Sequence, residues 1–168
     1  MQQIIKTTNI SVDTEKAIKS IRHDKLFILT DKNTHQHCYP HIKNIPAISA
    51  AKLIIIQADD SNKTIDNLCK VWEELTSNGA TRHSMLINLG GGMVTDLGGF
   101  AAATFKRGVK YINIPTTLLG AVDAAVGGKT GINFAGYKNE IGAFYPSEQV
   151  LISTEFFHTL THEAVLSG

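Results

Sequence analysis

The 168-residue sequence has few cysteines, little net charge and no long apolar run. Its two cysteines, Cys38 and Cys69, show no paired spacing that would suggest disulfides, which is typical of a reducing cytoplasm. The formal net charge is +1 and no basic run stands out, so we expect neither nucleic-acid binding nor membrane-surface binding. The longest apolar runs are strand-sized, and the N-terminus lacks the pattern of a signal peptide. These absences predict a cytoplasmic protein.

The length and the 43% hydrophobic content favour one soluble domain with a sizeable core. Short apolar runs alternate with amphipathic segments, which is typical of βαβ units. The fold class predicted is therefore α/β, with a Rossmann-like, mainly parallel sheet and flanking helices. We expect strands at Lys25–Thr30, Leu53–Gln57, Ser84–Leu89, Lys110–Ile114 and Gln149–Ile152, helices at Thr64–Ser77, Met93–Lys106 and Thr116–Val126, and helical turns from Thr154.

Four polar or glycine-rich segments directly follow the predicted strands. They are Thr30-Asp31, Ala58–Lys63, Gly90–Gly92 and Thr116-Thr117. Because the carboxyl ends of parallel strands meet at one edge of a sheet, and ligands bind there, these segments predict one shared binding edge.

The glycine triplet Gly90–Gly92 lies between a predicted strand and a predicted helix. Free backbone N–H groups and the positive end of the helix dipole at such a turn suit a pyrophosphate. The dinucleotide pattern G-x-G-x-x-G is not matched, because Thr95 occupies its last position. A tight turn without a ligand is the alternative. The small residues Gly98 and Gly99 predict very close packing of the helix that follows.

The segment Gly128–Thr130 resembles the end of a P-loop, GKT. That motif requires a glycine where this sequence has Asp123, and the segment follows a predicted helix instead of a strand. We therefore reject an NTP-binding loop.

Several charged residues have two possible roles each. Asp31 could accept hydrogen bonds from a ribose or serve as a turn residue. Asp60 and Lys63 could hold a ribose or cap the next helix. Asp123, alone in an apolar helical segment, could be buried against a cation or could face a site. Arg107, Lys129, Lys138 and Asn139 are each expected in a Gly-flanked turn, where cationic and amide groups suit an anionic ligand.

The runs GGGMVTDLGGFAAATFKRG, IPTTLLGAVDAAVGGKTGIN and KNEIGAFY closely resemble the 3-dehydroquinate synthase family of sugar-phosphate cyclases. The resemblance implies an NAD- and metal-dependent lyase of the shikimate pathway. Its members cyclise 3-deoxy-D-arabino-heptulosonate 7-phosphate, a phosphorylated keto acid, to 3-dehydroquinate and release phosphate. Two departures are Asp59-Asp60, where the family commonly has Gly-Glu, and Ala124-Ala125, where it often has two serines.

The resemblance also implies roles for particular residues. Positions that match substrate-binding residues of the family are Arg107, Asp123, Lys129 and Asn139. Positions that match NAD contacts are Asp31, Asp60, Lys63, Gly91, Gly92, Met93, Asp96, Thr116, Thr117, Lys138, Phe156 and Thr159.

No residue of this sequence matches a metal ligand of the family, whose zinc or cobalt site lies in a helical C-terminal domain. The cluster His35, His37, Cys38 and His41 also fits no structural zinc spacing. We expect residues 1–160 to form the NAD-binding domain and residues 161–168 to begin a truncated C-terminal domain. This chain alone is then predicted to be inactive, and the family implies a homodimer. Another sugar-phosphate cyclase, a polyol dehydrogenase and a non-catalytic NAD-binding module are the alternatives.

Overall fold

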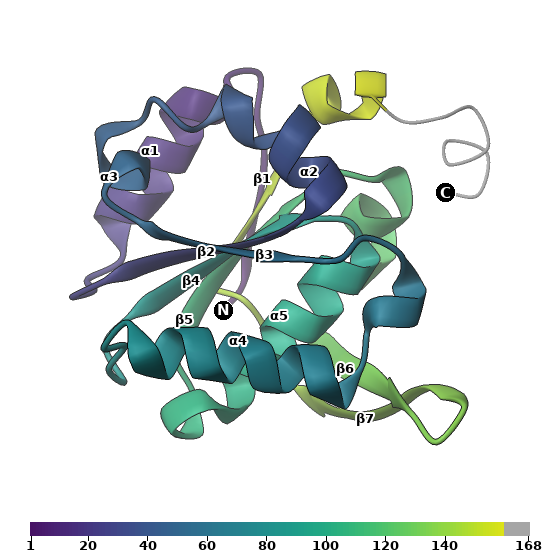
Figure 1. The fold of residues 1–168 in the computed structure, drawn as a ribbon. Helices are drawn as coiled ribbons and strands as arrows, with labels where there is room; N and C mark the ends of the chain where they lie inside the picture. Colours follow the sequence, from purple (N-terminus) through teal and green to yellow (C-terminus); the bar gives the residue numbers. More distant parts are fainter. Residues whose placement is uncertain (160–168) are drawn as a thin grey trace.

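All six strands of the main sheet run parallel, in the order β1-β8-β5-β4-β2-β3 (Figure 1). The computed structural model describes residues 1–159. The strands of this sheet are β1 (Gln3–Lys6), β2 (Leu26–Asp31), β3 (Lys52–Ile56), β4 (Met85–Gly90), β5 (Lys110–Pro115) and β8 (Gln149–Ile152). A separate antiparallel hairpin consists of β6 (Lys129–Phe134) and β7 (Tyr137–Phe144). The predicted fold class is confirmed.

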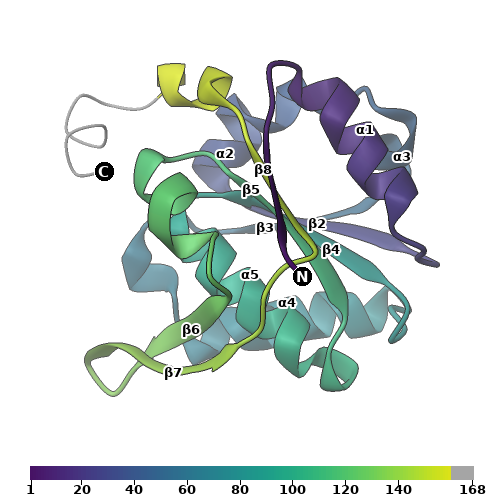
Figure 2. The same cartoon turned by 180° about the vertical axis from the view of Figure 1, so that it is seen from behind.

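Helices cover both faces of the sheet (Figures 1 and 2). One face carries α1 (Ile10–Ser20), α2 (Lys32–His37) and α3 (Pro46–Ser49), and the other carries α4 (Ile65–Ser77) and α5 (Gly92–Thr104). Shorter helical turns are η1 (Tyr39–His41), η2 (Asp60–Asn62), η3 (Phe105–Arg107), the π-helical η4 (Gly120–Ala124) and η5 (Thr154–Thr159). None of the helices in residues 1–159 is both long and apolar enough to cross a membrane.

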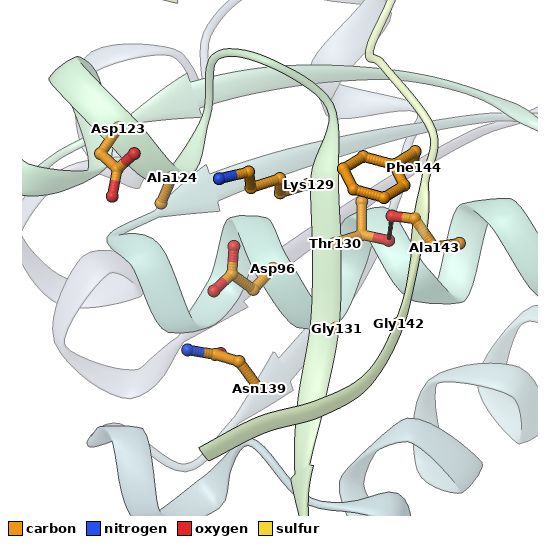
Figure 3. Close-up of a pocket in the computed structure, with 10 residues that line it drawn as sticks. All are labelled: Asp96, Asp123, Ala124, Lys129, Thr130, Gly131, Asn139, Gly142, Ala143 and Phe144. Atoms are coloured by element: carbon orange, nitrogen blue, oxygen red, sulfur yellow. Dashed lines mark hydrogen bonds between the residues drawn. The ribbon is translucent and has the colours of Figure 1, made fainter.

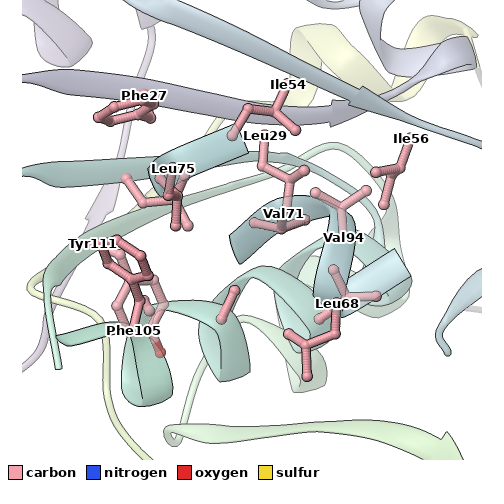
Figure 4. Close-up of a cluster of buried hydrophobic side chains, with 14 of the residues drawn as sticks. Phe27, Leu29, Ile54, Ile56, Leu68, Val71, Leu75, Val94, Phe105 and Tyr111 are labelled. Atoms are coloured by element: carbon pink, nitrogen blue, oxygen red, sulfur yellow. The ribbon is translucent and has the colours of Figure 1, made fainter. Parts of the chain in front are cut away.

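The central strands are buried on both faces, as covered parallel strands must be. In β2, Phe27 and Leu29 pack toward α4 and α5, whereas Leu26 and Ile28 pack toward α1 (Figure 4). Every residue of β2 and β4 is buried. This explains why both strands appear in the sequence as continuous apolar runs without polar alternation.

The five predicted strands are confirmed with shifts of a residue at their ends, and the predicted helices at 64–77 and 93–106 correspond to α4 and α5. The helix predicted at Thr116–Val126 is shorter, because only residues 118–124 are helical and η4 is π-helical. The sequence reasoning missed β1, the hairpin and the helices α1, α2 and α3. The predicted start of a second domain, residues 161–168, lies beyond the residues that the structure describes.

The β6–β7 hairpin packs directly against α5, and glycine makes this approach possible. A Cβ at Gly99 would come within 2.5 Å of Thr130 Cγ2 on β6. On the sheet side of the helix, a Cβ at Gly98 would lie 2.5 Å from Asn88 Cγ on β4. The predicted close packing of Gly98 and Gly99 is therefore confirmed, with the sheet on one side of the helix and the hairpin on the other.

Candidate functional site

The segments predicted to share one edge of the sheet lie at or just after the carboxyl ends of the parallel strands β2, β3, β4 and β5. After β2 the chain turns to α2 on one face, and after β4 it turns to α5 on the opposite face. A crevice outside adjacent strands whose connections diverge in this way is the usual ligand site of open α/β sheets. Thr34 spans it, since its hydroxyl donates to the carbonyl of Leu89 at 3.1 Å.

The glycine turn after β4 begins α5, and within residues 1–159 no side chain caps that helix. The turn packs closely against the segment that follows β5, and glycines on both sides allow this. A Cβ at Gly91 would lie 2.9 Å from Thr117 Cγ2, and a Cβ at Gly120 would lie 3.4 Å from the Gly92 nitrogen. The alternative of a tight turn thus accounts for part of the glycine content. The uncapped first turn of α5 still offers N–H groups and a positive dipole end, so the turn fits a pyrophosphate such as that of NAD.

Beside this turn lies a cavity of about 470 Å³ between α5, η4 and the hairpin (Figure 3). Of the predicted site residues, the structure brings Asp96, Asp123, Lys129 and Asn139 together in its wall. Sequence reasoning missed the other lining residues, which are Ala124, Thr130, Gly131, Gly142, Ala143 and Phe144. Most of these belong to the hairpin, whose sequence signal is the turn at Ala135-Gly136 between two aromatic residues.

Lys63 is the buried link between the elements that form this cavity. Its side chain is 5% exposed, and its ammonium lies 3.1 Å from Asp96 Oδ2 on α5 and donates to Asn139 Oδ1 on β7 at 2.6 Å. Asp60 Oδ1 lies 3.4 Å away on the preceding turn. Neither Asp60 nor Lys63 caps α4, because Thr64 accepts the hydrogen bond from the Asn67 N–H.

The loop that carries Asp60 and Lys63 is tied to the hairpin by further hydrogen bonds. The Asn133 N–H donates to the Lys63 carbonyl at 2.9 Å, and the Asn133 side chain accepts from the Asn139 N–H at 3.0 Å. At the surface, Lys138 Nζ lies 3.6 Å from Asp60 Oδ2. The polar residues from three elements therefore form one connected network beside the cavity.

Asp96 has an altered acidity in this network. Burial raises the pKa of its carboxyl above the ordinary value, and the attraction of Lys63 offsets this only in part. The nearby carboxylates of Asp60 and Asp123 raise the pKa further. Asp96 therefore holds its proton more strongly than an exposed aspartate does.

A distortion of β7 directs Asn139 toward the cavity. Three residues of β7 lie between two successive pairs, Ile132–Ile141 and Phe134–Tyr137, whereas β6 has one residue there. Within this bulge Asn139 has a φ of 54°, a left-handed conformation that asparagine tolerates better than most residues. Figure 3 shows its amide pointing toward Asp96.

Asp123 and Lys129 flank the other side of the cavity, where Figure 3 shows the lysine ammonium pointing toward η4. Asp123 is exposed, and within residues 1–159 no cation lies within ion-pair distance of it. Of its two predicted roles, the structure supports the one in which it faces a site. The helical turn that carries Asp123 is tied to β5, because the buried Asn113 amide donates to the Ala125 carbonyl at 3.2 Å.

The expectation that Arg107, Lys129, Lys138 and Asn139 lie in Gly-flanked turns is correct only for Arg107, because the other three lie on the hairpin strands. Arg107 is exposed and follows the far end of α5, about 20 Å from Gly92 at 1.5 Å per helical residue. The structure therefore does not bring Arg107 to the cavity.

The remaining residues predicted to contact NAD lie on other elements, and two of their side chains accept local hydrogen bonds. Asp31 caps α2, accepting from the Thr34 N–H at 2.9 Å, and Thr117 accepts from the Gly120 N–H at 3.0 Å. The side chains of Met93, Thr116 and Phe156 are buried. Thr159 is the last residue of η5.

The described residues offer few side chains that could act together as metal ligands. Residues 1–159 contain no group of three or more histidine, cysteine or acidic side chains placed to hold a metal. In the histidine cluster, His35 stacks on Tyr39 and His41 meets the ring of Phe156 edge-on. The described residues therefore do not fit a catalytic metal site.

Comparison with solved structures defines the class of this fold. A 2-epi-5-epi-valiolone synthase from Streptomyces hygroscopicus, solved with NAD⁺ and Zn²⁺ bound, matches with a TM-score of 0.86 and 28% identity over 98% of this chain and 46% of that one. A 2-deoxy-scyllo-inosose synthase with carbaglucose-6-phosphate, NAD⁺ and Co²⁺ shares the fold, with a TM-score of 0.85 at 23% identity over 98% of this chain and 45% of that one. The fold is that of the N-terminal part of sugar-phosphate cyclases.

Sequence comparison identifies the family within that class. The model of the 3-dehydroquinate synthase N-terminal domain matches residues 53–167. A 3-dehydroquinate synthase of Parabacteroides distasonis is 50% identical over 99% of this chain and 47% of its own length, and one of Pyrococcus abyssi is 54% identical over 68% of this chain and 34% of its own length. The chain belongs to the 3-dehydroquinate synthase family and spans less than half the length of these relatives.

Proposed function

We propose that this chain is the NAD-binding part of a 3-dehydroquinate synthase, the enzyme that converts 3-deoxy-D-arabino-heptulosonate 7-phosphate to 3-dehydroquinate and phosphate. The observation that carries the proposal is the position of the uncapped α5 N-terminus beside a cavity with Asp123, Lys129 and Asn139 in its wall. The 50% identity to the Parabacteroides distasonis relative supports this substrate over those of other cyclases. A polyol dehydrogenase would have less use for the Lys129 ammonium in the wall of this cavity.

NAD would lie across the crevice, with its pyrophosphate at Gly91 and Gly92 and a ribose within reach of Asp60 and Asp96. Bound NAD would supply reversible oxidation of a ring hydroxyl, which acidifies the adjacent C–H and makes phosphate elimination easy. The network of Lys63 fixes Asp96 and Asn139 relative to each other. Such fixed side chains favour the reaction by positioning the substrate before it reacts.

The substrate carries a phosphate and a carboxylate, and the cavity offers groups of matching chemistry. The exposed ammonium of Lys129 attracts an anionic group, and the Asn139 amide donates to an oxygen. Asp123 accepts from a sugar hydroxyl. A mere NAD-binding module would have no need of these three residues beyond the cofactor crevice.

We propose that the metal of the reaction binds outside residues 1–159. Its ligands would lie in a part that corresponds to the portion of the relatives not matched by this chain. The two structural neighbours were solved with Zn²⁺ and with Co²⁺ bound. We further propose action in the cytoplasm, in the shikimate pathway, as a homodimer. By this proposal the 168-residue chain alone neither releases phosphate from substrate nor binds zinc stoichiometrically, and detecting both would contradict it.

Calorimetric titration of NAD into the chain tests the cofactor site. We expect saturable binding that weakens about tenfold in Asp96→Asn, the change expected for one lost hydrogen bond to a charged group. Asp66→Asn, the same change on the exposed first turn of α4, should leave binding unaltered. Absence of NAD binding to the unmodified chain would refute the cofactor assignment.

A fusion of residues 1–168 to the unmatched C-terminal part of the Parabacteroides distasonis relative tests the reaction. We expect it to release phosphate from 3-deoxy-D-arabino-heptulosonate 7-phosphate and to lose this activity in Lys129→Gln. Phosphate release from glucose 6-phosphate instead, the sugar whose carba-analogue is bound in the 2-deoxy-scyllo-inosose synthase, would identify a different cyclase.

A further inference from the structure

A second cavity, of about 520 Å³, lies at the opposite end of the sheet from the proposed catalytic site. It is formed where three adjacent strands begin: by the loop before β2, the loop before β4 and the first residue of β5. Its volume is within the range of small-molecule sites. Neither the proposed reaction nor the proposed cofactor uses this end of the sheet.

Hydrogen bonds tie the two loops together, so the walls of the cavity are held in place. The Asp24 carboxylate accepts from the Ser84 hydroxyl at 2.7 Å and from the Thr81 hydroxyl. The Asp24 N–H donates to the His83 carbonyl at 3.2 Å. Ser84, which lines the cavity, is 3% exposed and also accepts from the Thr81 N–H at 2.9 Å.

Three cations line the cavity, and none of them pairs with a carboxylate of the described residues. The ion pairs within 4.0 Å in residues 1–159 are formed by Lys19, Lys63 and Lys138, and none by Arg22, Arg82 or Lys110. Asp24 is the single acid of the lining, and it leaves two net positive charges there, twice the net charge of the whole chain. Two guanidinium groups in one concave site suit phosphate oxygens, which they can bind in bidentate fashion.

The end of α4 beside this cavity already has a cation of its own. Lys25 donates to the carbonyls of Asn78 and Gly79 there, at 3.4 and 2.9 Å, so Arg82 is not required for that end of the helix. His23 places Nδ1 on the Ile21 carbonyl at 2.7 Å, and His83 Nε2 accepts from Arg82 Nε at 3.3 Å. Among residues 1–159, the second ring nitrogen of each histidine has no hydrogen-bond partner. His83 Nδ1–H therefore remains as a donor for an anion.

We propose that this cavity is a second binding site, distinct from the proposed catalytic cavity, for a small phosphorylated anion. Arg22, Arg82 and Lys110 bind the phosphate oxygens, and the His83 ring adds a further N–H donor. The shared chemistry of the ligand is a phosphate group, either as a free ion or as part of a condensed phosphate.

The test is a titration of the 168-residue chain with inorganic phosphate and, separately, with pyrophosphate at constant ionic strength. The readout is the set of histidine ring signals in NMR spectra. We expect saturable shifts of His23 and His83, and none of His35, which lies on α2 at the other end of the sheet. Tighter binding of pyrophosphate would identify a condensed phosphate as the ligand, and equal affinities would identify a single phosphate group.

Variants separate this site from general charge effects and from the catalytic cavity. We expect Arg82→Gln to weaken binding about tenfold or more, and Lys70→Gln, which removes an exposed cation of α4, to leave it unchanged. Lys129→Gln, in the proposed catalytic cavity, should also leave it unchanged. Shifts that do not saturate, that persist in Arg82→Gln or that disappear in Lys129→Gln would each overturn the proposal. Because Arg82 is exposed, its replacement should not impair folding.

Discussion

The ammonium of Lys63 lies 3.1 Å from Asp96 Oδ2 and 2.6 Å from Asn139 Oδ1. It thereby joins a residue predicted to contact the cofactor to one predicted to contact the substrate. The lysine itself is almost completely buried, so its role in this structure is to fix the β6–β7 hairpin against α5. In the proposed enzyme this fixed spacing would set the distance between the NAD crevice and the substrate cavity.

Lys63→Met is expected to reduce the free energy of unfolding by about 2 kcal/mol, because Asp96 and Asn139 lose a buried charged partner. The cost stays at this level because the Asp96 carboxyl can take up a proton when the lysine is gone. Urea unfolding measures the change. Lys138→Met, which removes a side chain that is 79% exposed beside Asp60, should cost less than about 0.5 kcal/mol. Equal losses in the two variants would show that the buried network is not stabilising.

The raised pKa of Asp96 predicts a pH dependence of stability. Between the ordinary value of 3.8 and the higher native pKa, the folded chain holds a proton that the unfolded chain has lost. Stability contributed by this group is therefore lost as the pH rises through that interval. Asp96→Asn removes the titration, so the variant should match the unmodified chain at low pH and be more stable at pH 7. Urea unfolding across this pH range measures the difference, and a less stable variant at pH 7 would mean that Lys63 outweighs burial.

The sequence predicted the sheet well because its central strands are buried on both faces. Short continuous apolar runs bounded by turn residues, such as those of β2 and β4, indicate fully buried strands. The edge strand β1 has only four residues and three of them are exposed, so no apolar pattern marks it. The shared location of the polar segments was predictable because the carboxyl ends of parallel strands lie at one edge of the sheet.

The hairpin could not be predicted in the same way. All residues of β7 except Ala143 are exposed, so no buried face marks this strand in the sequence. Gly131 and Gly142 further interrupt any strand pattern. Glycine is needed at 131 because a Cβ there would lie 2.7 Å from the Ile141 carbonyl oxygen. Its place in the structure depends on tertiary contacts with α5 and Lys63. For the same reason the cavity was predicted only through three charged residues and Asn139.

Gly98→Ala is expected to cost about 2 kcal/mol or more, because the new methyl group would overlap the amide of Asn88 in a closely packed part of the core. Asn88→Ala removes that obstacle but leaves Asn113 without the hydrogen bond that it accepts at 3.0 Å. The two changes together should therefore cost clearly less than the sum of the single changes. Urea unfolding of the three variants gives this difference. Additive losses would mean that Gly98 does not pack against Asn88.

The left-handed backbone at Asn139 gives a prediction that separates conformation from side-chain chemistry. Asn139→Gly and Asn139→Ala both remove the acceptor of the Lys63 ammonium, but only glycine adopts a φ of 54° without steric cost. The alanine variant should therefore be less stable than the glycine variant by about 1 kcal/mol in urea unfolding. At the neighbouring Glu140, which is exposed and has no positive φ, the order should reverse, with alanine more stable than glycine. The same order at both positions would refute the left-handed bulge that directs Asn139 to the cavity.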